Sequence, residues 1–319
     1  MTDDIDAPRL TPAQREIQDT LGASVDERPT FRDDLRDDLR GQIEHNFLEL
    51  LHDEIKLPIF LSKHGLNLLH GCEARFMAEQ EEDFEWSIPI ARGTVTHKAI
   101  ELHIGRRGNH TPIDLVEDAI SRLENEERSI SGFLRELVES DRSQLVADAN
   151  EVVATFFETF PPIKRRWVPV CESRVRADFC DDNITLAGKI DLTLGQAKGM
   201  TAGKVIFDLK TGKANQSHVD DLRFYALLET LKVGTPPRLL VNYYLESGTP
   251  RYEAVTEELL QSTARRVIDG VGKYIELNQS EPRPAEFAPG MNCRWCPINE
   301  RCEPGQLHLN EQSEAFGGP

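Results

Sequence analysis

The sequence predicts an α/β (α+β) protein with a central mixed β-sheet flanked by helices. Helical spacing of apolar residues dominates the chain up to "FPPIKRRW" (160–167), where two consecutive prolines stop helical structure. Alternating or continuous apolar runs rich in β-branched residues follow, and helical spacing then returns. Because helices precede and follow the strands, we expect a sheet with helices packed against it. Strands are expected at 167–179, 184–195, 204–212, 238–248 and 250–256.

The expected helices are segments in which apolar residues recur every three or four positions. The first has Thr11 as its N-cap and Pro12 at the first helical position. The second repeats Arg and Asp, which suits a solvated, salt-bridged face. Between two of the strands, the Gly-rich "QAKGMTAG" (196–203) suits a hairpin loop. Helices are expected at 11–22, 31–55, 61–80, 92–105, 113–127, 131–159, 217–233 and 257–278.

Composition bounds the class of protein. The 319 residues are 39% hydrophobic, which is enough for one large domain or two smaller ones. A formal net charge of -18, from 55 acidic against 37 basic residues, argues against a broad cationic surface but leaves room for a local basic groove. The chain has no apolar run long enough to span a membrane and no apolar signal core at its N-terminus. We therefore expect a soluble cytoplasmic protein without a membrane partner.

The stretch "VIFDLKTGK" (205–213) places an acid and a base on one face of an apolar strand. Side chains alternate along a strand, so Asp208 and Lys210 point the same way. Asp191 lies on the preceding strand, and neighbouring strands are about 4.8 Å apart, so both carboxylates can hold one divalent cation. Lys210 can then stabilise the charge that grows on a phosphoryl transition state. The alternative is an ordinary cross-strand Asp–Lys pair on a surface hairpin.

These residues also carry a family resemblance. "GKIDLT" followed by "VIFDLKTGK" resembles the core of the PD-(D/E)XK nuclease superfamily, in its RecB-like exonuclease branch. The Gly-x-x-Asp and Asp-x-Lys-Thr-Gly motifs of that branch match residues 188–191 and 208–212. Its upstream helical Gly-x-x-x-His motif is supplied by "GTVTH", with Gly93 and His97. The resemblance implies a restriction-endonuclease-like core.

The resemblance also implies roles for individual residues. Mg²⁺ or Mn²⁺ would be held by His97, Asp191, Asp208 and the backbone carbonyl of Leu209. The catalytic set would be Asp191, Asp208, Lys210 and Tyr225. The alternative for His97 is a helix-face histidine bonded to a neighbour.

One motif departs from the family pattern. The branch has Gln-x-x-x-Tyr on the helix after the Asp-x-Lys strand, whereas this chain has "DLRFY", with Asp221 in place of the Gln and Tyr225 kept. The departure bears on the contact with a DNA strand rather than on the metal site. Glu172, in "VCESRV", resembles an acidic position on the family's preceding strand, with a solvated glutamate as the alternative.

Six cysteines are present, and three of them crowd into "CRWCPINERC" (293–302). A closed four-thiolate site needs a fourth ligand. Upstream, "CEARF" (72–76) resembles the Cys-Pro-x-Arg-Phe of the iron–sulfur members of the branch, with Glu73 in place of Pro. The resemblance implies that a [4Fe–4S] cluster is bound by Cys72, Cys293, Cys296 and Cys302. Zinc held by the same four cysteines is the alternative. Cys171 and Cys180 are expected to be small buried hydrophobes.

The pattern is most similar to the nuclease domain of AddB-type helicase–nucleases and to the CRISPR-associated iron–sulfur exonucleases. It implies a metal-dependent DNA exonuclease that prefers single strands and acts in DNA repair, recombination or CRISPR adaptation, with a helicase or a CRISPR adaptation protein as partner. We expect an acidic, partly helical extension at 1–54, a nuclease domain closed by the iron–sulfur staple at 55–305, and a flexible tail at 306–319.

Two rival functions stay open at this stage. A catalytically silent nucleic-acid-binding or assembly subunit would fit the net charge of -18 and Asp221, although Asp191, Asp208 and Lys210 are intact. A zinc-stapled structural protein would need no nucleic acid. The basic, aromatic "IKRRW" (163–167) and "RRG" (106–108) suit either a groove for a single strand or a solvated turn.

Overall fold

The computed structural model describes residues 9–52, 55–106, 108–127, 129–215 and 217–315. The chain forms two compact units, each built from segments that are not contiguous in sequence. Unit 1 comprises Met1–Leu35, Trp86–Val175 and Lys189–Glu257, and unit 2 comprises Arg36–Glu85, Arg176–Gly188 and Glu258–Pro319. The division between the units falls within strands β2 (Val170–Phe179) and β3 (Ile184–Leu194).

The strands form a mixed sheet, as the sequence predicts. Its order is β1-β3-β4-β5-β6, and β2 pairs with β3. Strands β4 and β5 are parallel, whereas β4 pairs antiparallel with β3, and β5 pairs antiparallel with β6. Strand β1 runs parallel to the first part of β3. The remaining strands are β1 (Ile59–Ser62), β4 (Val205–Lys210), β5 (Leu239–Tyr244) and β6 (Thr249–Ala254).

The core of unit 1 is built around β4, which is buried along most of its length. One face, carrying Val205, Phe207 and Leu209, packs into an apolar cluster with α8 (Glu139–Thr159) and Ile17 of α1 (Pro12–Leu21). The other face is covered by α9 (Ser217–Val233), which packs against β4 and β5. The alternation predicted for this strand is therefore confirmed.

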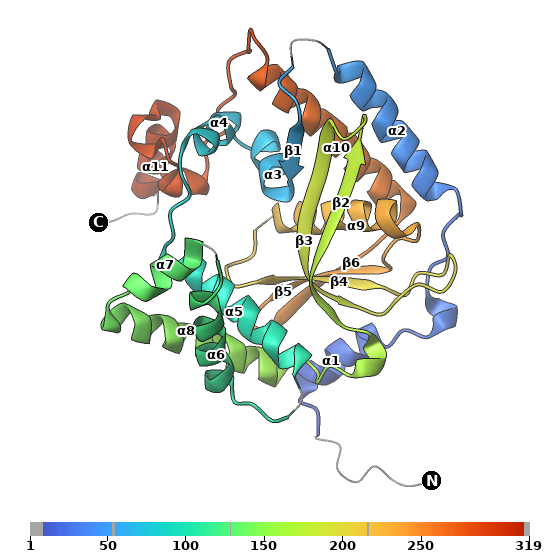
Figure 1. Cartoon of the computed structure of the whole chain (residues 1–319), viewed down its shortest axis with the longest axis vertical. Helices are drawn as coiled ribbons and strands as arrows, with labels where there is room; N and C mark the ends of the chain where they lie inside the picture. Colours follow the sequence, from blue (N-terminus) through green and yellow to red (C-terminus); the bar gives the residue numbers. More distant parts are fainter. Residues whose placement is uncertain (1–8, 53–54, 107, 128, 216, 316–319) are drawn as a thin grey trace. The chain divides into compact units, whose positions relative to one another are not determined.

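A helical cluster completes unit 1. Helices α5 (Ile88–Gly105), α6 (Pro112–Glu124), α7 (Ser129–Glu136) and α8 form one group in Figure 1, and their buried residues share a second apolar core. The prediction of a single helix at 131–159 is wrong, because α7 ends at Glu136 and α8 begins at Glu139. The N-cap of α8, Val138, is extended, with φ -67° and ψ 154°. Neither Pro nor Gly marks this break, so helical periodicity alone could not reveal it.

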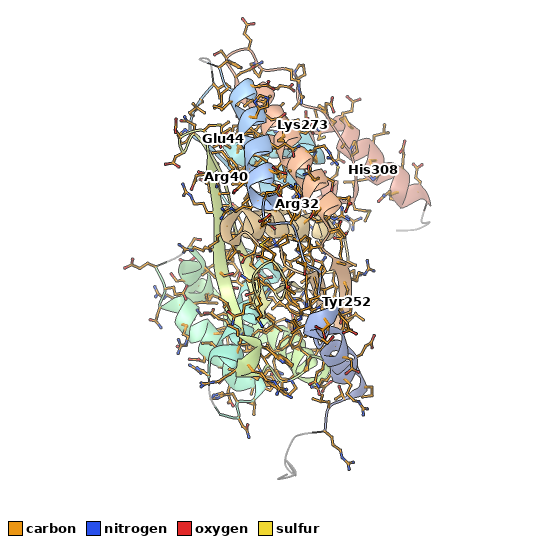
Figure 2. The ribbon with its side chains drawn as sticks, turned by 90° about the vertical axis from the view of Figure 1, so that its right-hand side faces the viewer. Arg32, Arg40, Glu44, Tyr252, Lys273 and His308 are labelled. Atoms are coloured by element: carbon orange, nitrogen blue, oxygen red, sulfur yellow. The ribbon has the colours of Figure 1, made fainter. Side chains whose placement is uncertain are left out.

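Unit 2 contains helices from both ends of the chain. Helix α2 (Leu35–Leu50), which carries Arg40 and Glu44, lies beside α10 (Glu257–Asn278), which carries Lys273 (Figure 2). The apolar side of α2 is fully buried, and Phe47 on that side makes an edge contact with Phe179, with ring centroids 5.3 Å apart. The other elements are α3 (Lys63–His70), α4 (Glu73–Glu81), α11 (Glu303–Ala315), and the 3-10 turns η3 (Met291–Trp295) and η4 (Asn299–Arg301).

The helix predicted at 61–80 is also wrong as a single element. Its first residues belong to β1, and Gly71 and Cys72 separate α3 from α4. The backbone of Gly71 lies so close to α3 that a Cβ there would be 3.0 Å from the carbonyl oxygen of Asn67. Cys72 is extended and serves as the N-cap of α4. The break therefore places this cysteine at a helix start rather than on a helix face.

In the part of the chain that the structure describes, every helix is too short or too polar to cross a membrane. Residues 12–21 and 35–50, which fall in the predicted N-terminal extension, form α1 and α2. The domain boundaries predicted from the sequence stay predictions.

Candidate functional site

The predicted acidic hairpin opens at the point where its carboxylates lie. The antiparallel pairing of β3 with β4 runs to Leu192 opposite Phe207. Two residues further along β4, the N–H of Leu209 donates to Oδ2 of Asp191 at 2.7 Å instead of to a backbone carbonyl. A side-chain carboxylate thus takes the next hydrogen bond of the ladder, which holds Asp191 firmly against β4.

Helix α5 brings the predicted histidine to the same place. Gly93 permits the approach, because a Cβ there would be 3.2 Å from Oγ1 of Thr211 just after β4. Nη2 of Arg92 donates to the carbonyl of Thr211 at 2.8 Å and fixes the helix there. One turn later, Nε2 of His97 donates to the carbonyl of Leu209 at 2.8 Å. This bond turns Nδ1 of His97 toward Oδ1 of Asp191, 3.4 Å away.

Glu172 joins this pair through an irregularity in β2. Its backbone has φ 54°, in the left-handed region that non-glycine residues rarely adopt. Such a residue within a strand re-aims its side chain, and Oε1 of Glu172 lies 4.0 Å from Nδ1 of His97. The ligand atoms of His97, Glu172 and Asp191 all lie within 4.8 Å of one another. The sequence indicated Glu172 only by its place on the strand, since nothing in "VCESRV" signals the irregular backbone.

The charges of the site act together on His97. Burial by itself lowers the pKa of this ring, but the neighbouring carboxylates of Asp191, Glu172 and Asp208 outweigh burial and raise it to about 9. In the absence of a cation the imidazole is therefore protonated at neutral pH. A divalent cation could replace that positive charge among the same carboxylates.

Lys210 lies between two buried carboxylates. Its Nζ is 2.5 Å from Oδ2 of Asp208 and donates to Oδ2 of Asp221, on α9, at 2.7 Å. Asp208 is 2% exposed and Asp221 is 7% exposed. Tyr225 lies one turn beyond Asp221 and is also buried. The second carboxylate stands where the family pattern has Gln, so the sequence indicated the position but not the ion pair.

A cleft of about 380 Å³ opens beside the histidine and carboxylates. His97, Glu172 and Asp191 line it together with the cations Lys98, Arg174 and Lys189. Lys98 is 3.1 Å from Glu101 and 3.4 Å from Glu126, and Lys189 pairs with Glu172. The cleft thus holds carboxylates that could bind a cation next to three cationic side chains, two of which are paired with carboxylates.

The fold and this geometry agree with a comparison of the sequence with protein families. The family model of the PD-(D/E)XK nuclease superfamily matches residues 61–303. The chain belongs to this superfamily. The matched span contains every predicted site residue, from Cys72 to Cys302.

Solved structures give more distant likenesses to this PD-(D/E)XK chain. A candidate exonuclease from Eubacterium rectale is 11% identical, with a TM-score of 0.45 over 78% of this chain and 87% of that one. The protein SSO0001 is 12% identical, with a TM-score of 0.36 over 84% of this chain and 96% of its own. A comparison with curated proteins gave no match.

The four cysteines predicted to act together line one cavity in unit 2 of the nuclease. This cavity has a volume of about 150 Å³. Gly305, at the start of α11, closes one side, because a Cβ there would be 3.2 Å from Sγ of Cys302 and 3.4 Å from Sγ of Cys293. The backbone N–H of Gly290 donates to Sγ of Cys293 at 3.3 Å. The predicted cysteines are Cys72, Cys293, Cys296 and Cys302.

An ion pair with a buried carboxylate holds the two halves of this cavity next to each other. The carboxylate of Glu73, 1% exposed, accepts two bonds from Arg283, at 2.6 and 2.9 Å. It also accepts the N–H of Glu286 at 3.0 Å, while the N–H of Ala74 donates to the carbonyl of Glu286 at 3.1 Å. The sequence showed Glu73 only as a departure from the family's Pro, because its partner lies 210 residues away.

The two remaining cysteines lie apart from that cavity. Burial is the first cause that raises the pKa of Cys171 to about 12 and that of Cys180 to about 11. Cys180 is 4% exposed, and Cys171 packs at the edge of the core around β4. The expectation of a buried hydrophobe thus fits Cys180, whereas Cys171 is half-buried; both pKa shifts favour the neutral thiol.

Proposed function

We propose that the chain is a metal-dependent DNA exonuclease of the RecB-like branch, which hydrolyses phosphodiester bonds and prefers single strands. One observation carries this proposal. In a chain of the PD-(D/E)XK superfamily, His97 and Asp191 meet at Leu209 of β4, between the Asp208 and Lys210 of the Asp-x-Lys motif. Nuclease chemistry needs carboxylates for a cation and a positive group for the phosphate at one place, and these residues supply both.

The residues present fit a hard divalent cation. Mg²⁺ and Mn²⁺ prefer carboxylate and carbonyl oxygens, and Mn²⁺ also accepts imidazole. The holders would be His97, Asp191, Asp208 and the carbonyl of Leu209, and the ligand distances in this structure add Glu172 to that set. When bound, the cation supplies Lewis-acid activation of the phosphate and of the attacking water.

The chain's own residues prepare that reaction. The Leu209 amide and carbonyl orient Asp191 and His97, so both keep their direction without a cation. Asp208 and Asp221 hold the ammonium group of Lys210 at the edge of the site. From there Lys210 can stabilise negative charge on the phosphate, and Tyr225, the fourth residue of the proposed catalytic set, is buried on the same helix as Asp221.

The cleft and the resemblance support the substrate and the pathway that we propose. Lys98, Arg174 and Lys189 line the cleft beside the carboxylates, where backbone phosphates of DNA would pass. A single strand, which needs no separation of bases, suits a cleft of about 380 Å³. We place the activity in DNA repair, recombination or CRISPR adaptation, with a helicase or a CRISPR adaptation protein as partner.

We further propose that the cysteine cavity holds a [4Fe–4S] cluster. The four thiols line one cavity, and Gly305 leaves space next to two of the sulfurs that any larger residue would fill.

Metal analysis of two variants tests the cluster. In anaerobically purified protein, Cys72→Ser should lose most of its bound iron, whereas Cys171→Ser is the matched control and should keep it. Zinc without iron in the native protein would establish the zinc alternative. Iron retained at the native level by a folded Cys72→Ser variant would remove Cys72 from the ligand set.

A nuclease assay tests the enzymatic proposal. End-labelled single-stranded DNA is incubated with anaerobically purified protein in Mn²⁺, in Mg²⁺ or in chelator. We expect degradation with either cation, none in chelator, and a loss of about a hundredfold or more in Asp208→Asn. Asp220→Asn, on the neighbouring helix α9, is the matched control and should retain activity.

The second candidate is a catalytically silent nucleic-acid-binding subunit, and the position of Asp221 favours it. Two buried carboxylates already neutralise the charge of Lys210, so its attraction for a phosphate is weaker. A folded, cluster-loaded protein that binds DNA but degrades neither DNA nor RNA with any cation would establish this candidate and reject the exonuclease.

A further inference from the structure

Three arginines meet around a second cavity of unit 1, which the proposed reaction does not use. The cavity has a volume of about 200 Å³ and lies where the β3–β4 hairpin turns, at Gly195 and Gly203. Its basic residues come from three distant parts of the chain, and an indole lies among them. These lining residues are Arg28, Arg166, Trp167 and Arg238.

Arg238 is a buried guanidinium with donor capacity to spare. The residue is 9% exposed, and its backbone is held because its N–H donates to the carbonyl of Lys204 at 2.8 Å. Nη2 donates to the carbonyl of Leu21, at the end of α1, at 2.8 Å. Its Nε is buried and has no hydrogen-bond partner. A buried donor without an acceptor destabilises the fold, and an oxygen atom of a bound anion would satisfy this one.

The charge of the cavity is uncompensated. Within the described residues, none of Arg28, Arg166 and Arg238 forms an ion pair with a carboxylate, which is unusual for Arg238, the one of the three that is buried. Arg28 donates from Nε and Nη2 to the carbonyl of Ala23, at 3.2 Å each. Burial and the neighbouring charge of Arg28 both lower the pKa of Arg238. An anion between these guanidinium groups would relieve their repulsion.

The walls of the cavity depend on unusual backbone. A Cβ at Gly203 would be 2.0 Å from the carbonyl oxygen of Gln196 and 3.1 Å from Nη1 of Arg28, so only glycine fits. Val168, a β-branched residue, adopts φ 49° directly after Trp167. The carbonyl of Trp167 in turn accepts the N–H of Gly195 at 2.5 Å. These constraints hold the "KRRW" turn against the hairpin.

We propose that this cavity binds the phosphate group of a nucleotide, with the guanidinium groups of Arg28, Arg166 and Arg238 on the phosphate oxygens and the indole of Trp167 beside the base. Guanidinium groups match phosphate geometry and keep their charge, and aromatic rings stack on any base. The phosphate belongs either to a nucleic-acid strand or to a free mononucleotide, because both present the same chemistry.

The cavity is distinct from the proposed cation site. Asp191 lies three residues before Leu194 on β3, which corresponds to about 10 Å along the strand. A nucleic-acid strand bound in the cation cleft would thus contact different residues from a phosphate bound in this cavity. That the phosphate comes from a nucleotide rests on the proposed nuclease function, whereas the anion site itself does not.

Binding measured in chelator separates this inference from catalysis. The full chain is titrated with a fluorescent oligothymidylate of ten nucleotides, with thymidine monophosphate, and with inorganic phosphate. Arg166→Gln removes an exposed lining arginine without touching the core, and Arg238→Gln removes the buried one. Arg165→Gln, the exposed neighbour outside the cavity, removes the same charge and serves as the control.

We expect each lining variant to bind its ligand at least about tenfold more weakly, and the control to bind within about twofold of the native chain. If only the oligonucleotide binds more weakly, and the slope of log affinity against log salt concentration falls by about 0.7, the phosphate belongs to a nucleic-acid strand. A loss for thymidine monophosphate assigns it to a free nucleotide. Equal binding of every probe by Arg166→Gln and the native chain overturns the site, even if Arg238→Gln fails to fold. Because binding is measured in chelator, it does not depend on nuclease activity. If the native chain degrades no DNA but the lining variants still bind the probes more weakly, only the proposed nuclease function is rejected.

Discussion

The proposed cation site and the cysteine cavity are built in different ways. At the cation site, regular elements position the ligands: β3 carries Asp191, β4 carries Asp208, α5 carries His97, and direct hydrogen bonds to Leu209 orient two of them. At the cysteine cavity, three of the four cysteines come from the short 3-10 segments η3 and η4 or the residues beside them, where the described bonds to sulfur are few.

The difference indicates where each region gets its order. The side chains of the cation site hold one another and are arranged before any cation arrives. The cysteine segment is held next to α4 by Glu73 and Arg283, outside the sulfurs themselves. We therefore expect substitutions at the proposed cation site to lower nuclease activity, and substitutions around the cysteine cavity to lower the free energy of unfolding.

The largest expected effect is that of Asp191→Asn on catalysis. The amide oxygen can still accept the Leu209 N–H, so the fold is retained, but the negative charge that attracts the cation is lost. Metal-dependent degradation of single-stranded DNA should fall by about a hundredfold or more. Iron content should match the native protein, and a parallel loss of iron would show that the two regions are not independent.

The ion pair of the cysteine region should show the next effect. Glu73→Gln removes the buried charge that Arg283 binds, while Arg283, 31% exposed, keeps Glu276; the free energy of unfolding should fall by about 2 kcal/mol, measured by urea titration. Glu276→Gln is the matched control, because Glu276 also bonds Arg283 but is 55% exposed, and its cost should stay below about 1 kcal/mol. Equal costs for both variants would contradict the role given to burial.

The affinity of the proposed cation site should depend on pH through His97. The carboxylates outweigh burial and raise the pKa of His97 to about 9. A cation needs the unprotonated ring, so it must displace a proton at any pH below that value. Affinity for Mn²⁺, measured by calorimetry without DNA, should therefore fall as pH drops from 9, by up to about tenfold per unit. His97→Gln should flatten this dependence between pH 9 and 6, and an unchanged slope would exclude His97 as a ligand.

The smallest expected effect concerns Asp221. Asp221→Asn keeps a hydrogen-bond acceptor for Lys210 but removes a negative charge from the edge of the site. The KM for single-stranded DNA should fall by about threefold, with a smaller change in kcat, because less negative charge opposes the phosphates. Asp220→Asn alters the same helix by the same charge and should leave KM unchanged. A rise in KM for Asp221→Asn would mean that this carboxylate positions Lys210 for substrate.

Much of the cation site was predictable because its pattern is local. Alternation along "VIFDLKTGK" puts Asp208 and Lys210 on one face, and in the structure Lys210 bridges Asp208 to α9 on that face. The spacing of Gly93 and His97 is one helical turn, which is why the glycine can dock α5 while the histidine reaches Leu209. Such short-range regularities follow from helix and strand geometry alone.

Boundaries without a local signal were harder to predict. Helices α7 and α8 are separated at Val138, where apolar spacing continues and neither Pro nor Gly marks the break. Between α3 and α4 the break does carry a local signal, because Gly71 is the C-cap of α3. Strand β1 is only four residues long and is defined by its partner β3, 125 positions away. Propensity within a short window carries no information about such partners.

By itself, the sequence determined the mixed fold, the superfamily motifs and the residues that alternation and helical spacing bring together. The tertiary structure alone decided which distant charges meet. It paired Asp221 with Lys210 and Glu73 with Arg283, turned Glu172 toward His97, and gathered Arg28, Arg166 and Arg238 around one cavity. The reason is physical: the energy of a charge depends on its burial and on neighbours that are far away in sequence, and both exist only once the chain has folded.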